Sequence, residues 1–160
     1  MNKETRKQRI EELKRKNFKK QVEEKFRGIC ASITDFEFLT SEEIELRFQN
    51  VYSNGQEPQI QFKHSLNRIM KEMSFLQEEF EAYKNEYILV DQKEILPSYR
   101  LKLKFEDFWN NLNLIADFLN LEDESSLFWF TLLGYQKNFG IFIYEDEYGL
   151  DHILFWNENS

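Results

Sequence analysis

The stretch YRLKLKFEDFWNNLNLIADFL, residues 99–119, decides the fold class because its hydrophobic period changes part-way along. Residues 99–104 alternate apolar with basic side chains, the period-2 pattern of a strand with one solvated face. From Phe105 to Leu119 the apolar residues follow helical spacing and share an arc of about 120°. A strand that leads directly into an amphipathic helix predicts a domain that combines helices with a sheet.

Residues 3–27 predict an N-terminal helix, since they contain no Gly or Pro, and Gly28 stands where a helix C-cap is expected. Three apolar residues of its second half share one face: Phe18, Val22 and Phe26. Ile10 and Leu13 fall well away from that face. We therefore expect the second half of the helix to dock on the domain and the first half to be a loosely held arm.

Two further helices and a strand are expected before residue 99. Thr40 with Glu43 forms a capping-box pattern, so a helix should begin there and end at Ser53-Asn54-Gly55. Its inward-facing residues would be Ile44, Phe48 and Val51. Residues 65–83 predict a strongly amphipathic helix, and residues 87–91 predict a strand.

The C-terminal third predicts a β-hairpin. Residues 139–144 and 152–156 are rich in aromatic and β-branched residues, and the turn between them contains Gly149. The apolar run 127–133 fits either a strand or a short helix.

The expected class is therefore α+β, or α/β, with three to four helices on a small, mainly antiparallel sheet that ends in a C-terminal β-hairpin. We expect residues 1–27 to form a basic helical arm and residues 28–160 a single globular domain.

Composition bounds the class and the compartment. The chain has 160 residues, of which 41% are hydrophobic and 16% aromatic, enough for one dense core. Cys30 is the single cysteine, which excludes an intramolecular disulfide and favours the cytoplasm. The sequence contains no stretch of about 20 apolar residues, so we expect no membrane anchor.

Charge is distributed unevenly along the chain, whose net charge is -8. Residues 1–27 contain eleven Lys and Arg against five Glu, a net charge of +6. Residues 105–160 contain one Lys against eleven Asp and Glu, a net charge of -10. An asymmetry of this kind can matter for the choice of partners.

The sequence contains no recognisable catalytic motif. His64 and His152 lack the neighbouring ligands that a metal site requires, and the surroundings of Cys30 resemble no known active site. With five glycines in the chain, no phosphate-binding loop is present. We therefore expect no enzyme activity, no metal and no cofactor, although a site assembled in space can leave no linear motif.

Two surfaces are candidates for partner binding. The first is an acidic patch with two aromatic anchors, which would attract a basic protein by electrostatic steering. It comprises Glu122, Asp123, Glu124, Glu145, Asp146, Glu147, Asp151, Tyr148 and Trp156. The second is the basic arm, with Lys14, Arg15, Lys16, Lys19 and Lys20. These basic side chains point in all directions around the helix, and the acidic chain opposes a polyanion, so we consider nucleic acid an unlikely partner.

The chain resembles, in type, the small acidic immunity proteins of bacterial polymorphic or contact-dependent toxin systems. The resemblance rests on its size, its aromatic content, the acidic segment 139–156 and its Lys-, Asn- and Phe-rich usage. It implies a non-enzymatic cytoplasmic inhibitor that binds a basic toxin domain through its acidic surface. The alternative hypothesis is a regulatory or scaffold module that uses the basic helix to contact nucleic acid or an acidic protein.

Overall fold

The computed structural model describes residues 3–40, 58–63, 65–121 and 129–158. These residues form four α-helices, one 3-10 helix and seven β-strands, which confirms the α+β class. The helical elements are α1 (Lys3–Ile29), α3 (Leu66–Glu79), η2 (Glu81–Tyr83), α4 (Phe105–Asn110) and α5 (Leu112–Phe118). The strands are β1 (Phe36–Thr40), β2 (Ile60–Lys63), β3 (Tyr87–Asp91), β4 (Tyr99–Lys104), β5 (Trp129–Gly134), β6 (Gly140–Glu145) and β7 (Leu150–Trp156).

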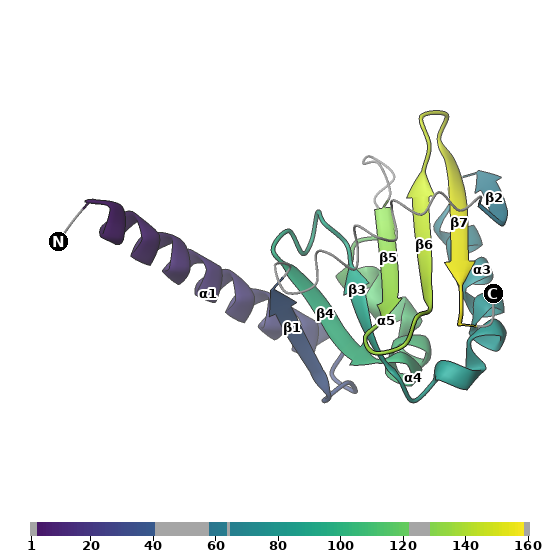
Figure 1. Cartoon of the computed structure of the whole chain (residues 1–160), viewed down its shortest axis with the longest axis horizontal. Coiled ribbons are helices and arrows are strands. Elements are labelled where there is room, and N and C mark those ends of the chain that lie inside the picture. Colours follow the sequence, from purple (N-terminus) through teal and green to yellow (C-terminus); the bar gives the residue numbers. More distant parts are fainter. Residues whose placement is uncertain (1–2, 41–57, 64, 122–128, 159–160) are drawn as a thin grey trace.

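All seven strands belong to one sheet in the order β1-β4-β3-β5-β6-β7-β2, and every neighbouring pair is antiparallel. The strands β6 and β7 form the expected C-terminal hairpin. The strands β1 and β2 lie at opposite edges of the sheet (Figure 1). The run 127–133, which the sequence left open between strand and helix, contains most of β5.

The described helices cover one face of the sheet, and the main core lies between them and that face (Figure 1). Strand alternation directs every second residue into this layer. Ile88 and Val90 of β3 are fully buried there, and Ile141 and Ile143 of β6 are too. The core is rich in phenylalanine, which explains how a chain of this size fills the space beneath a seven-stranded sheet.

The helix α1 is docked along its second half. The Phe26 ring contacts the rings of Phe36, Phe38 and Phe118, with centroid separations of 4.6, 5.9 and 5.0 Å. In the first half Ile10 is 45% and Leu13 60% exposed, and this part of the helix projects from the body of the molecule (Figure 1). The sequence pattern predicted this division.

Gly28 is not the C-cap that we expected, because α1 continues through it to Ile29. The Cys30 N–H still donates to the Phe26 carbonyl at 2.7 Å, which extends the helical hydrogen-bond pattern past the glycine. Burial of Cys30 and Ile33 beyond the helix favours this longer path.

The helix α3 follows the prediction for residues 65–83 closely. Ser65 is its N-cap, with its side-chain oxygen accepting from the Arg68 N–H at 3.1 Å. Ile69, Met73 and Leu76 face the core. The chain then tightens into η2, so Tyr83 also reaches the core.

Residues 105–119 form two short helices where we expected one. Asn111 separates α4 from α5 with φ -122° and ψ 24°, outside the helical region. Its side-chain amide donates to the Asp107 carbonyl at 2.9 Å and accepts from the Ser32 hydroxyl at 2.7 Å. An asparagine side chain that bonds nearby backbone competes with the helix, which explains the break.

The two edge strands, β1 and β2, were not predicted from the sequence. They are short, and each has a single buried side chain, Phe38 in β1 and Phe62 in β2. The helix expected after Thr40 lies outside the described residues, and Thr40 itself ends β1.

Phe26→Ala should lower the free energy of unfolding by about 3–5 kcal/mol, because it leaves a cavity among three aromatic rings. Leu13→Ala is the matched control on the same helix, and its effect should stay within about 0.5 kcal/mol because Leu13 is exposed. Denaturant unfolding measures both variants. Equal effects of the two substitutions would contradict the half-docked helix.

Candidate functional site

The C-terminal hairpin carries the part of the predicted acidic patch that the structure describes. Glu145 of β6 pairs with Asp151 of β7, and four residues form the turn between the strands. The Asp146 N–H donates to the Leu150 carbonyl at 2.9 Å. Gly149 has a φ of 75°, a left-handed conformation that glycine adopts without strain, and its N–H donates to the Asp146 carbonyl at 3.1 Å.

Asp146 is the residue that holds this turn. One carboxylate oxygen accepts the backbone N–H groups of Tyr148 and Leu150, each at 2.9 Å. The other lies 2.7 Å from Nε2 of His152. Because an ionised carboxylate can only accept, Nε2 carries the hydrogen and donates it. The hydrogen bond from His152 and those from the two backbone N–H groups keep the pKa of Asp146 below its ordinary value.

The turn leaves an aromatic side chain among carboxylates at its end. Tyr148 is 80% exposed and Glu147 is exposed, while Glu145 is half-buried. We call Glu145, Asp146, Glu147 and Tyr148 the hairpin tip. Because Asp146 fixes the backbone, the turn is pre-organised and would lose little backbone entropy on binding.

Two residues of the predicted patch do not belong to this surface. Asp151 is fully buried, because strand alternation places it on the same face of β7 as the buried Ile153. Trp156 is half-buried beside Gly140, where a larger residue would clash with the indole ring. The Trp156 indole N–H donates to the Asn138 side chain at 3.2 Å, so this ring supports the sheet. Glu122, Asp123 and Glu124 lie outside the described residues.

The predicted basic arm lies on α1. Lys14, Arg15, Lys16 and Lys20 are exposed, while Lys19 is half-buried. Lys16, Lys19 and Lys20 each pair with a glutamate one turn away on the same helix, at 3.1, 3.8 and 3.8 Å. Ion pairs of this kind stabilise a helix by a few tenths of a kcal/mol at most. These lysines can therefore exchange their glutamates for carboxylates on another molecule at little cost in free energy.

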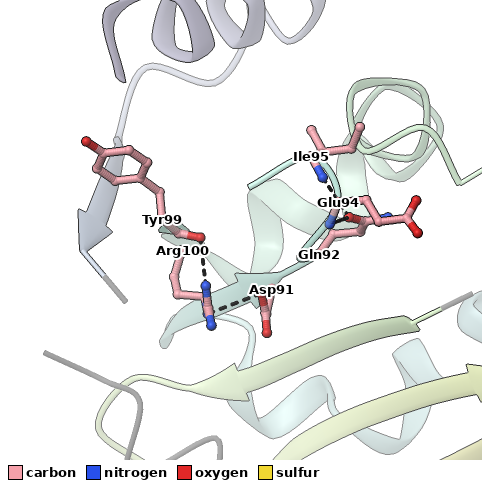
Figure 2. A network of polar contacts seen from close by, with 6 residues as sticks. All are labelled: Asp91, Gln92, Glu94, Ile95, Tyr99 and Arg100. Carbon is pink, nitrogen blue, oxygen red and sulfur yellow. Dashed lines mark hydrogen bonds and ion pairs between the residues drawn. The ribbon is translucent and has the colours of Figure 1, made fainter. Parts of the chain in front are cut away.

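A buried ion pair between β3 and β4 was missed in the sequence. Arg100 Nε lies 3.2 Å from Asp91 Oδ1, and the Arg100 guanidinium also donates to the Tyr99 carbonyl at 3.1 Å (Figure 2). The side chains of Arg100 and Asp91 are 2% and 0% exposed. Alternation in 99–104 predicted a solvated Arg100, and that prediction is wrong because Asp91 on the neighbouring strand compensates the buried charge.

The polar network next to this pair is structural. Gln92 Oε1 accepts the backbone N–H groups of Glu94 and Ile95 at 2.8 and 2.9 Å, which fixes the connection from β3 to β4 (Figure 2). The Tyr99 hydroxyl donates to the Arg15 carbonyl at 3.1 Å and so ties β4 to α1. These hydrogen bonds hold the β3–β4 connection and α1 against the sheet, so the network has a structural role.

The other candidate chemical groups are placed as follows. Burial, with a smaller contribution from Asp117, raises the pKa of the Cys30 thiol to about 11, so the thiol is protonated at neutral pH and is a poor nucleophile. His152 serves the hairpin turn, and His64 lies outside the described residues. Within the described ranges, no three His, Cys, Asp or Glu side chains gather as a metal shell would.

Comparison with protein-family models, with curated proteins and with solved structures found no match. Among the described helices, none combines the length and the apolar character needed to cross a lipid bilayer.

The stability contributed by Asp146 should depend on pH. Its folded pKa lies below the unfolded value of about 3.9, so the contribution is complete above that value and is lost as the pH falls through the folded pKa. Asp146→Asn should be less stable than the unchanged protein at neutral pH, and the difference should shrink below about pH 4. Denaturant unfolding across a pH series measures it. Glu147→Gln is the control, since it removes an adjacent carboxylate and leaves the bonds of Asp146 in place. A difference that stays constant down to about pH 2 would contradict this role.

Proposed function

We propose that this chain is a non-enzymatic protein-binding protein whose hairpin tip engages a basic partner protein. The observation that carries the proposal is the exposed Tyr148, held among carboxylates by a turn that Asp146 fixes. Tyrosine is enriched among residues that dominate binding energy, because it combines a large apolar ring with a polar end.

Charge supports a basic partner. Residues 105–160 carry a net charge of -10, and the tip contains three consecutive carboxylates. A surface of one sign accelerates encounter with a partner of the opposite sign and disfavours acidic partners. The steering is strongest at low salt.

Among proteins of this kind, the chain resembles immunity proteins, and we propose that its partner is a toxin domain that it blocks in the cytoplasm. Inhibition by occlusion needs a rigid, complementary surface and no catalytic group. The resemblance supplies the class of partner, and the hairpin tip supplies the surface.

A second candidate function uses the basic arm as a docking element of a regulatory or scaffold module. The observation that favours it is the projection of the first half of α1, where residues 5–17 are all exposed (Figure 1). In this case binding would depend on the arm, and the hairpin tip would be dispensable.

The test is affinity capture from an extract of the cells that produce the protein, followed by a toxicity assay of the captured protein. We expect the intact chain to capture a basic protein and to suppress its toxicity. Glu147→Lys/Tyr148→Ala should weaken this binding at least about 30-fold, the effect of losing a dominant contact.

Phe75→Ala/Glu78→Lys is the matched control, because it removes an exposed aromatic ring and reverses an exposed carboxylate on α3. It should bind like the intact chain. Capture that is insensitive to the tip substitutions but lost on deletion of residues 1–20 would favour the arm hypothesis instead. A captured protein whose toxicity persists when bound would contradict the immunity role.

A further inference from the structure

The first half of α1 has a distinct basic and apolar face. At 100° per residue, Arg6, Lys7, Leu13 and Lys14 lie within about 60° of Ile10, whereas Glu11 and Glu12 fall outside that arc. We call Arg6, Lys7, Ile10, Leu13 and Lys14 the arm face. The basic residues 14–20 still point in all directions around the helix, but over residues 6–14 the acids lie outside this face.

The arm face and the hairpin tip have complementary chemistry. The arm face presents two exposed aliphatic side chains, Ile10 and Leu13, bordered by three cations. The hairpin tip presents the exposed Tyr148 ring beside the exposed Glu147, with the half-buried Glu145 and Asp146 adding negative charge. Apolar groups can meet at the centre of such a contact while opposite charges meet at its rim, the usual anatomy of a protein interface.

The two surfaces cannot meet within one molecule. The arm leaves the body beside β1, at one edge of the sheet, whereas the hairpin lies on the other side of the sheet's centre (Figure 1). Two arms would not pair with each other through this face either, because both carry three cations there and like charges repel.

We propose that the arm face of one molecule docks on the hairpin tip of a second copy of this chain. Tyr148 of one copy packs against Ile10 and Leu13 of the other, while Glu147 and the negative charge around it attract Arg6, Lys7 and Lys14. The contact is heterologous, so it joins copies head to tail. It uses the same tip as the proposed function, and a basic partner protein would therefore compete with self-association.

Sedimentation of the purified chain tests this inference without any partner protein, so its failure would leave the proposed function untouched. At about 0.05 M NaCl the average mass should rise with protein concentration, and at about 0.5 M it should return to the monomer value because salt screens the charges. Lys7→Glu/Lys14→Glu and Glu145→Lys/Glu147→Lys should each weaken association at least about tenfold at low salt.

Two controls separate this contact from a general charge effect. Lys71→Glu/Lys137→Glu changes the net charge as much as the arm variant does, at exposed positions outside the arm face, and should associate like the unchanged chain. The arm variant is Lys7→Glu/Lys14→Glu and the tip variant is Glu145→Lys/Glu147→Lys. When the two are mixed, the arm of each faces a tip of opposite charge on the other, so association should return. Circular dichroism confirms that each variant is folded.

A monomer at every concentration in low salt would overturn the inference, and so would association that the arm variant or the tip variant leaves unchanged. A chain that remains monomeric but binds duplex DNA in an arm-dependent manner would assign the arm to nucleic acid instead.

Discussion

The packing of Phe26 against Phe36, Phe38 and Phe118 is the interaction on which the arrangement of this molecule depends. It joins α1 to the first strand and to α5, and so fixes the direction of a 27-residue helix relative to the sheet. The apolar face of α1 stops at Phe18, which stacks on Tyr99. The Tyr99 hydroxyl also holds the Arg15 carbonyl. Hydrogen bonding within one continuous helix extends beyond that contact, so the first half of α1 projects from the body of the molecule (Figure 1).

In the acidic C-terminal hairpin too, packing and hydrogen bonding decide which charged side chains face outward. Alternation buries Asp151 beside Ile153, and the turn consumes the hydrogen-bonding capacity of Asp146. What remains outward is the Tyr148 ring with the neighbouring Glu147. The uneven charge of the sequence thereby becomes two surfaces of opposite sign that are held apart by the sheet, and the proposed contact between copies derives from that separation.

Local periodicity made much of this structure predictable. The change of period at Phe105, the docking face of α1 and the closing hairpin all follow from side-chain spacing. Arg100 and Asp151 were predicted to be exposed, but both are buried. Burial of a charged residue depends on its neighbours across the sheet, and strand order cannot be read from the sequence. The short edge strands carry too few buried residues to give a signal. Tyr148 was identified, but its exposure and its pre-organisation depend on the hydrogen bonds of Asp146.

Amide hydrogen exchange along α1 distinguishes a helix that is docked over one half from a helix that is docked along its whole length. The exchange is measured on dilute protein at about 0.5 M NaCl, where salt screens charged contacts between copies. We predict slow exchange for residues 20–29, which open with the core, and much faster exchange for residues 6–16. Uniformly slow exchange from residue 6 to residue 29 would show that the whole of α1 is docked, which would contradict the half-docked helix.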